Sequence, residues 1–319
     1  MNKDNAKRPV VSVRLMTYNH ENYIEQALRG IDMQITDFEF EVVIGDDFST
    51  DGNLEKIKSF KFLNKNITVN LLNRVEGDSY SLLRRKNGRL HNFIDILNNC
   101  KGKYIALLDG DDYWTDPLKL QKQVDFLEAN PEYSLVCGGF KSVNTVTGEE
   151  ITAIKDVENS IDNTEQGFDI TLERFFKQWL TKTLTLVYRT ELYNPNDFKN
   201  YKYTRDVHLN YHLLKRGKGY YMKEVFGAYH IHDGGTFSAE STKNNVKNGY
   251  LVYKEIYLND KNSFTKKVYI NASRRYLEFF KKVEMPFKEK LIIIWSSFFY
   301  INDIKDLKKS IKNIKKLIY

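Results

Sequence analysis

Four aspartates fall within ten residues in the segment LLDGDDYWTD, residues 107–116. Three of them, Asp109, Asp111 and Asp112, directly follow the apolar run YIALL. Carboxylates this close repel one another unless a positive charge lies among them. Carboxylate oxygens are the ligands that Mg²⁺ and Mn²⁺ prefer, and Mg²⁺ commonly completes its coordination shell with substrate phosphates. The segment therefore predicts a site for Mn²⁺ or Mg²⁺ together with a phosphorylated ligand.

The alternative for these aspartates is a structural turn that caps the following helix. Aspartate is favoured at helix N-caps, and proline is common in the first helical turn. Asp116 stands directly before Pro117 and suits this role. One capping aspartate is sufficient for one helix, so the other three remain candidates for ligand binding.

Two more polar clusters follow strand-like runs. TYNH at residues 17–20 follows VVSVRLM, and GDDFSTD at residues 45–51 follows FEVVI. In a doubly wound sheet, ligands bind at the carboxyl ends of the strands. We therefore expect these two clusters and the aspartates of residues 109–112 to line one crevice, although they are far apart in the sequence.

Strand and helix patterns alternate through the first half of the chain. Strands are expected at residues 10–16, 40–44, 67–72, 103–108 and 133–140, and helices at about 21–34, 51–63, 87–99 and 116–129. This alternation predicts an α/β fold with a Rossmann-like, mostly parallel sheet and helices on both faces. After an irregular loop with a hairpin at 141–167, a strand at 183–188, a helix at about 204–216 and a strand at about 219–231 are expected. Residues from 241 onward are expected to be mainly helical.

The net charge of +7 is unevenly distributed, with +10 in residues 261–319 and −3 in the preceding 260 residues. Basicity is thus a property of the C-terminal stretch, and we expect no nucleic-acid partner. Cys100 and Cys137 lack metal-ligand spacing and favour a reducing compartment. The N-terminal residues lack the apolar core of a signal peptide, and the longest apolar run, residues 291–301, is too short to span a bilayer. A cytoplasmic protein is therefore expected.

Three motifs together resemble the family 2 glycosyltransferases of bacterial surface-polysaccharide synthesis. They are TYN at residues 17–19, GDDFSTDG at 45–52 and KGKYIALLDGDDYW at 101–114, and the resemblance extends over about residues 10–240. It implies a GT-A fold, a nucleotide-sugar donor and inversion at the anomeric carbon. It also implies a catalytic domain at 1–240, with a nucleotide-binding half at about 8–140 and an acceptor half at about 141–240. Residues 241–319 would form a helical, basic extension.

The resemblance also assigns roles to individual residues. It places Tyr18 at the nucleobase, Asp47 on a base N–H group and an arginine of residues 82–86 near the nucleotide. The nucleotide-binding residues are then expected to be Thr17, Tyr18, Asn19, Asp47, Arg85 and Asp109, with Asp111 on the metal ion and Asp112 and Trp114 on the substrate. The alternatives are a packed aromatic for Tyr18 and an Asx-type turn for Asp47.

Inversion requires a base that takes the proton of the acceptor hydroxyl. The family places an aspartate at the start of a helix in the second half, which corresponds to Asp206 in TRDVHL. Arg205 stands where the family often has an acid, and its charge should lower the pKa of Asp206. In the later segment YHIHDGG, the resemblance makes His232 a metal ligand or phosphate contact, whereas His230 would point to the opposite face of an extended strand.

The last residues carry an apolar stripe among lysines, formed by Ile304, Leu307, Ile311, Ile314 and Ile318. This stripe could pack on the catalytic domain, pair with a second copy as a homodimer, or lie on an anionic membrane. The third alternative would make the protein peripheral at the inner face of the cytoplasmic membrane, where polyprenyl-linked acceptors are found.

The sequence thus favours a metal-dependent inverting glycosyltransferase that moves one sugar, with UDP-sugar the favoured donor, to a glycan or polyprenyl-linked acceptor. A nucleotidyltransferase is the alternative enzyme, although TYNHENY stands where its glycine-rich phosphate loop would be expected. A non-catalytic nucleotide-sugar-binding module is the third reading. It would gain support if Asp206 and His232 lay far from Asp111.

Overall fold

The computed structural model describes residues 8–152, 166–178, 180–203, 205–232 and 242–279, together with residues 286–288, 291, 295, 308, 311 and 312. The chain divides into two compact units. Unit 1 contains Met1–Asp197 and Leu209–Gly235, and unit 2 contains Phe198–His208 and Thr236–Tyr319. The predicted boundary near residue 240 stays a prediction, and residues 198–208, which include Asp206, group with the C-terminal residues.

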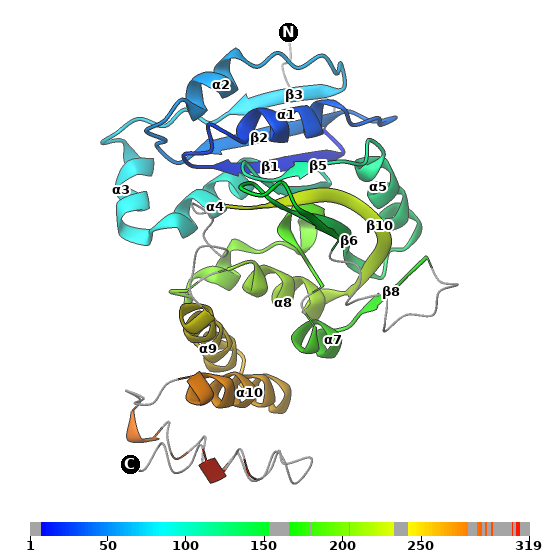
Figure 1. Cartoon of the computed structure of the whole chain (residues 1–319). Helices are drawn as coiled ribbons and strands as arrows, with labels where there is room; N and C mark the ends of the chain where they lie inside the picture. The colour runs from blue at the N-terminus through cyan, green and yellow to red at the C-terminus, as the bar shows by residue number, and fades with distance from the viewer. Residues whose placement is uncertain are drawn as a thin grey trace. The chain divides into compact units, whose positions relative to one another are not determined.

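Unit 1 is built on a mixed sheet (Figure 1). Among the described residues its strands follow the order β3-β2-β1-β4-β9-β6-β10-β5, and β7 and β8 pair with β6 and β10. The bounds are β1 Val11–Thr17, β2 Phe40–Asp46, β3 Ile67–Leu71, β4 Tyr104–Asp109, β5 Tyr113–Trp114, β6 Tyr133–Asn144, β7 Glu150–Thr152, β8 Gly167–Ile170, β9 Val187–Arg189 and β10 Lys218–Ile231. The long pairings β1–β2, β1–β4 and β6–β10 are parallel, which confirms the predicted α/β class. The pairings of β9 with β4 and β6 are antiparallel.

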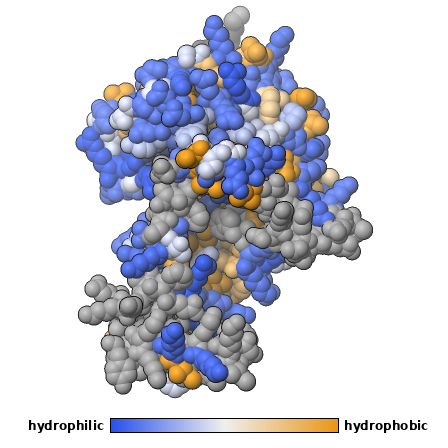
Figure 2. Space-filling model, in the orientation of Figure 1, coloured by the Kyte–Doolittle hydropathy of each residue, from blue (hydrophilic) through white to orange (hydrophobic). Residues whose placement is uncertain are grey.

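Helices cover both faces of this sheet. Val13 and Leu15 of β1 point to one face and share a buried core with α1 (Ile24–Asp32). Arg14, between them, points to the other face, where its guanidinium lies 5.2 Å from the ring centroid of Phe93 in α4 (Arg89–Asn99). The alternation of side chains along a strand explains this arrangement, because neighbouring residues face opposite layers. On the face shown in Figure 2, hydrophilic residues cover most of the surface of the sheet-bearing unit.

Helices α3 and α7 and the segment 183–188 depart from the sequence prediction. The other helices are α2 Asn53–Ser59, α3 Ser79–Asn87, α5 Lys119–Ala129, α7 Leu172–Lys177, α8 Asp206–Arg216, α9 Thr242–Asn259 and α10 Ser263–Phe279. Helix α3 was not predicted; Asp78 caps it by accepting a 2.7 Å hydrogen bond from the Ser81 backbone, and Gly88, with φ of 67°, separates it from α4. The strand predicted at 183–188 is a 3₁₀ turn, Thr183–Thr185, followed by the short β9.

In unit 2, helices α9 and α10 pack through tyrosines. The rings of Tyr250 and Tyr276 stack at 4.7 Å, and those of Tyr257 and Tyr269 stack at 5.4 Å. The predicted apolar stripe of residues 304–318 lies outside the described residues except for Ile311, which is exposed. Within the part of the chain that the structure describes, none of the helices is both long and apolar enough to span a membrane.

Candidate active site

The three polar clusters meet at one edge of the sheet, as expected. In the parallel register Thr17 lies beside Asp46, and Met16 lies beside Asp109. The turn after β4 lies close to the turn after β1, because a Cβ atom built on Gly110 would stand 2.6 Å from the Thr17 hydroxyl oxygen. A glycine is therefore required where these two loops meet.

The loop after β1 is locked to the loop after β2. Asn19, with φ of 53°, accepts a 2.8 Å hydrogen bond from the Thr50 backbone through its side-chain oxygen, and its own N–H donates to the Ser49 hydroxyl at 2.9 Å. Asp46 accepts hydrogen bonds from the Ser49 backbone at 2.9 Å and from the Asn53 amide at 2.7 Å. These bonds give Asn19 and Asp46 structural roles, while Tyr18 of the same loop as Asn19 is exposed, with 48% of its surface accessible.

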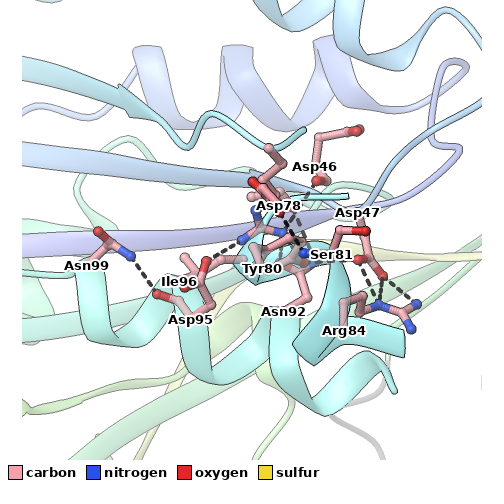
Figure 3. Close-up of polar contacts among 12 residues, drawn as sticks. Asp46, Asp47, Asp78, Tyr80, Ser81, Arg84, Asn92, Asp95, Ile96 and Asn99 are labelled. Atoms are coloured by element: carbon pink, nitrogen blue, oxygen red, sulfur yellow. Dashed lines mark hydrogen bonds and ion pairs between the residues drawn. The ribbon is translucent and has the colours of Figure 1, made fainter. Parts of the chain in front are cut away.

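Asp47 is buried against α3 (Figure 3). Its two carboxylate oxygens each accept a 2.8 Å hydrogen bond from Nε of Arg84, and Nη2 of Arg84 approaches at 2.7 Å. The Tyr80 hydroxyl donates a further 3.0 Å bond to Asp47. The hydrogen bond to Asp47 raises the pKa of Arg84, so the guanidinium stays charged.

The arginine beside Asp47 is thus Arg84 and not the predicted Arg85. Arg85 lies on the exposed side of α3 and pairs with Glu76 at 2.7 Å. The two residues differ by 100° around the helix, so only one of them can face the sheet edge. A role for Arg85 at the nucleotide has no contact in this structure to support it.

A second arginine supports Tyr80 from behind. The guanidinium of Arg74 lies 3.8 Å from the ring centroid of Tyr80 and forms a 2.8 Å ion pair with Asp95 of α4. It also donates hydrogen bonds to the Tyr80 hydroxyl and to the side-chain oxygen of Asn92. Burial raises the pKa of Tyr80 well above its ordinary value, so its hydroxyl remains a donor to Asp47.

Asp109 has a buried partner in the middle of β1. Arg14, which is 1% exposed, donates a 2.8 Å hydrogen bond to a carboxylate oxygen of Asp109. A buried charge needs a counter-charge, and this pair supplies one. The remaining surface of Asp109 faces outward from the strand end, where a ligand could bind.

Asp111 faces two histidines. Nε2 of His232 lies 3.2 Å and Nε2 of His20 lies 3.7 Å from the same oxygen, Oδ2 of Asp111. Burial raises the pKa of Asp111, but the His232 hydrogen bond and the His20 charge outweigh it, and the pKa lies below its ordinary value. Asp111 and His232, which the resemblance placed at the metal ion or the diphosphate, are therefore neighbours in the structure.

His230 fixes the turn that carries these aspartates. Its Nδ1 lies 2.6 Å from the Asp111 carbonyl oxygen, so this nitrogen carries the donated proton. Its backbone N–H donates to the Asp112 carboxylate at 3.2 Å, and its ring packs between Tyr23 and Tyr113 at centroid distances of 5.2 and 5.1 Å. His230 therefore joins β10 to the turn after β4.

The two residues assigned to substrate lie in the interior. Asp112 is 3% exposed; burial and the nearby charges of Asp111 and Asp109 raise its pKa well above the ordinary value. Trp114 is 1% exposed, and its indole N–H donates a 2.8 Å bond to the Leu184 carbonyl. Trp114 is therefore a core residue, which corrects its predicted role at the substrate. Asp112 lies against β10.

The donor set at Asp111 suits a divalent ion that binds mainly through its substrate. Within the described residues, no group of three or more His, Cys, Asp or Glu side chains is arranged to hold a metal ion by itself. Asp111 and His232 nevertheless place a carboxylate oxygen and an imidazole nitrogen 3.2 Å apart. Mg²⁺ usually takes one or two protein carboxylates and completes its shell with phosphates and water. The residues fit such an ion.

Asp206 belongs to unit 2. It begins α8, and its carboxylate accepts a 3.0 Å hydrogen bond from the Val207 backbone. The structure therefore bears out its place at a helix start, while its role as a base stays a prediction. The glycines of YHIHDGG lie outside the described residues.

Several contact residues were missed from the sequence. Arg14, Arg84, Tyr80 and His230 were not assigned to the site. Arg14 had a local signal, since a charged residue inside the β-branched run VVSVRLM must be paired when buried. For Arg84 the resemblance indicated residues 82–86 but did not distinguish the two arginines there. For Tyr80 there was no signal, because α3 itself was not predicted.

The mixed sheet with helices on both faces and carboxylates at its strand ends has the arrangement of the GT-A fold. Residues 12–185 match the model of glycosyl transferase family 2, which is more than half of the chain, so the chain belongs to that family. This confirms the resemblance seen in the three motifs and excludes the nucleotidyltransferase reading.

Individual relatives agree with this assignment. The putative teichuronic acid biosynthesis glycosyltransferase TuaG of Bacillus subtilis is 26% identical over 251 residues, covering 78% of this chain and 89% of TuaG. An uncharacterized protein of Mycobacterium tuberculosis, Rv1520, is 41% identical over 128 residues, which span only 34% of its length and 40% of this chain. Residues 1–349 of S. aureus TarS share the fold, with a TM-score of 0.57 at 20% identity, over 96% of this chain and 90% of TarS.

Proposed function

We propose that this glycosyltransferase moves one sugar, with inversion, from a nucleoside-diphosphate sugar to a glycan or polyprenyl-linked acceptor of a surface polysaccharide. The observation that carries the proposal is the meeting of Asp47, Asp109 and Asp111 at one edge of the sheet, each held by a different partner. TuaG, by its name, acts in teichuronic acid biosynthesis, and TarS has been solved with UDP-GlcNAc. The name of TuaG supports a polysaccharide product, and the ligand of TarS supports a UDP-sugar donor.

In this proposal the nucleotide lies over the loops after β1 and β2. Tyr18 offers an exposed ring on which a base can stack. Asp47 is held by Arg84; its carboxylate suits the imide N–H of uracil, and it would equally suit thymine. Thr17 and Asn19 shape the loop, and Asp109 would contact the ribose.

The diphosphate then lies at Asp111 and His232, which would hold Mn²⁺ or Mg²⁺. When bound, such an ion stabilises the negative charge that develops on the departing nucleoside diphosphate. Asp111 and His232 orient this end of the donor, and His230 keeps their turn in place. Asp206 takes the proton of the acceptor hydroxyl as it attacks the anomeric carbon from the face opposite the diphosphate.

Calorimetric titration of UDP, TDP and GDP, each with and without Mn²⁺, tests the donor site. We expect one nucleotide, UDP, to bind in a Mn²⁺-dependent way to the wild type and to lose that dependence in Asp111→Ala. If none of the three binds under either condition, the proposal is wrong.

The role of Asp206 as the base has a test of its own. Asp206→Asn should abolish transfer while donor affinity is kept; unchanged transfer would remove Asp206 from the base role. Membrane association through the basic C-terminal stretch is a separate proposal. It is tested by liposome flotation with and without residues 285–319, and equal partitioning would contradict it.

A further inference from the structure

The segment that leads to Asp206 is held by a single carboxylate of α9. Glu255, which is 9% exposed, accepts a 2.8 Å hydrogen bond from the Lys202 backbone and a 3.1 Å bond from the Tyr203 backbone. Each of its oxygens thus takes one of two consecutive N–H groups. Hydrogen bonds to a charged acceptor are stronger than neutral ones, so Glu255 fixes the backbone at residues 202–203.

Glu255 also reaches the first turn of α8 through His208. Oε2 of Glu255 lies 3.7 Å from Nε2 of the fully buried His208. Nδ1 of the same ring accepts a 3.1 Å hydrogen bond from the Arg205 backbone. Because Nδ1 is the acceptor, the ring proton of a neutral His208 is on Nε2, toward the carboxylate. Glu255 therefore favours the tautomer that caps the N–H of Arg205.

Asp206 stands directly after Arg205, so these bonds bracket it. Residues 202 and 203 are fixed on one side and residue 208 on the other, and all of them belong to unit 2. A second residue of α9, Tyr253, lies close to Asp206: burial and then the Asp206 charge raise the pKa of this tyrosine. The helix that follows the acceptor half in sequence thus contacts the segment of the predicted base at several points.

We propose that Glu255 is a positioning residue for Asp206, and that α9 is therefore part of the catalytic apparatus on the acceptor side. The proposal rests on the role of Asp206 as base given above. Glu255 acts through the backbone and through His208 and touches no substrate. Its loss should affect the rate of transfer and leave the affinity for the nucleotide unchanged.

The test compares wild type with Glu255→Gln, which keeps the size of the side chain but has one acceptor oxygen in place of two. Lys247→Gln, an exposed position of the same helix, is the matched control. Amide hydrogen exchange is measured without any ligand in peptides covering residues 198–208. In parallel, kcat for transfer and UDP affinity by calorimetry are measured for each variant.

We expect exchange at residues 202–205 to be faster by about tenfold in Glu255→Gln, kcat to fall by a similar factor and UDP affinity to stay at the wild-type value. Lys247→Gln should match wild type in all three. Unchanged exchange in Glu255→Gln would overturn the proposal, whatever the activity. Faster exchange with unchanged kcat would also overturn it, since the order of the segment would then not matter for transfer.

Failure of the base assignment gives a different result. If Asp206→Asn keeps full transfer while Glu255→Gln shows faster exchange, the proposed base is wrong and the contact itself is real. If Glu255→Gln does not fold, Glu255→Asp decides, because it keeps the carboxylate but shortens its reach. An intermediate exchange rate together with an intermediate kcat would then support the positioning role, and wild-type values of both would overturn it.

Discussion

The loops after β2 and β4 present carboxylates at the same edge of the sheet, but these carboxylates have different partners. Asp47 forms a close ion pair with Arg84 and a hydrogen bond with Tyr80. Asp111 faces only imidazoles among the ion pairs of the described residues, and its neighbour Asp112 is buried with a raised pKa. The carboxylate of the first loop is paired with an arginine, whereas the ion-pair partners of Asp111 among the described residues are imidazoles.

This difference separates two kinds of ligand recognition. A carboxylate fixed by an arginine offers a rigid acceptor of defined direction, which suits the N–H group of a base. A carboxylate whose neighbours are imidazoles is stabilised when a metal cation binds, and that cation can then bind a diphosphate. Aspartate thus acts as a directed hydrogen-bond acceptor in one loop and as a charge that attracts a cation in the other.

The largest expected effect separates the two loops by their dependence on metal. Asp111→Asn should lower kcat/KM by roughly 10³-fold, because it removes charge stabilisation of the leaving group. Its UDP affinity should no longer respond to Mn²⁺. Asp47→Asn should weaken UDP binding equally with and without Mn²⁺.

Steady-state kinetics and calorimetry of both variants check this, and Asp125→Asn, an exposed aspartate of α5, serves as control. If both variants lost the response to Mn²⁺ to the same degree, the distinction between the loops would be wrong.

The second prediction concerns two adjacent arginines of α3. Arg84→Gln leaves the buried Asp47 without its ion pair, and the KM for the donor should rise by about tenfold, since a charged hydrogen bond contributes roughly 1.5–3 kcal/mol. Arg85→Gln removes only an exposed pair with Glu76, and its KM should stay within twofold of wild type. An equal effect of both substitutions, or a larger one for Arg85→Gln, would return the nucleotide contact to Arg85.

The same pair of loops shows how far sequence alone reaches. The carboxyl-end clusters and the partner of Asp111, His232, were predicted because strand ends and motifs are visible in a linear sequence. The parallel sheet places them together with no further information. The contacts with Arg84 and Tyr80 depend on α3, which begins at Ser79 after the cap residue Asp78 and carries few apolar residues, so its periodicity gave no signal.

The contacts of His230 could not be predicted for another reason. Strand alternation predicted that His230 points to the face opposite His232. Alternation along one strand gives no information about the turn after β4, which packs against β10. The register shifts that bend β10 between Met222 and Gly227 are set by tertiary packing. Trp114 was misassigned because a motif position says nothing about burial.

The third prediction removes the link between β10 and the turn after β4. His230→Phe keeps the ring between Tyr23 and Tyr113 but loses the hydrogen bond to the Asp111 carbonyl. We expect kcat to fall by about tenfold and the free energy of unfolding by about 1–2 kcal/mol, while UDP binding without metal stays unchanged. Steady-state kinetics measures kcat, urea unfolding measures the free energy of unfolding, and calorimetry measures UDP binding. A loss of metal-free UDP affinity would instead assign His230 to nucleotide binding.

The smallest effect on transfer is expected for Lys119, a buried residue of α5 that packs against Trp114. Its ammonium lies 4.3 Å from the Trp114 ring centroid and 2.7 Å from the Gln123 side-chain oxygen, and it is fully buried. Burial lowers the pKa of Lys119 from 10.5 to about 7. Between these values the unfolded chain binds a proton that the folded chain does not, so the contribution of Lys119 to stability rises with pH.

The free energy of unfolding of wild type, relative to Lys119→Met, should therefore increase by up to about 1.4 kcal/mol per pH unit between pH 7.5 and 9.5. Below pH 7 the difference should be constant, because the lysine is then protonated in both states. Urea unfolding at several pH values measures it, with the exposed Lys58→Met as control. Parallel pH curves for wild type and Lys119→Met would mean that Lys119 keeps its charge beside the Trp114 ring. A buried cation would then lie close to the loop after β4.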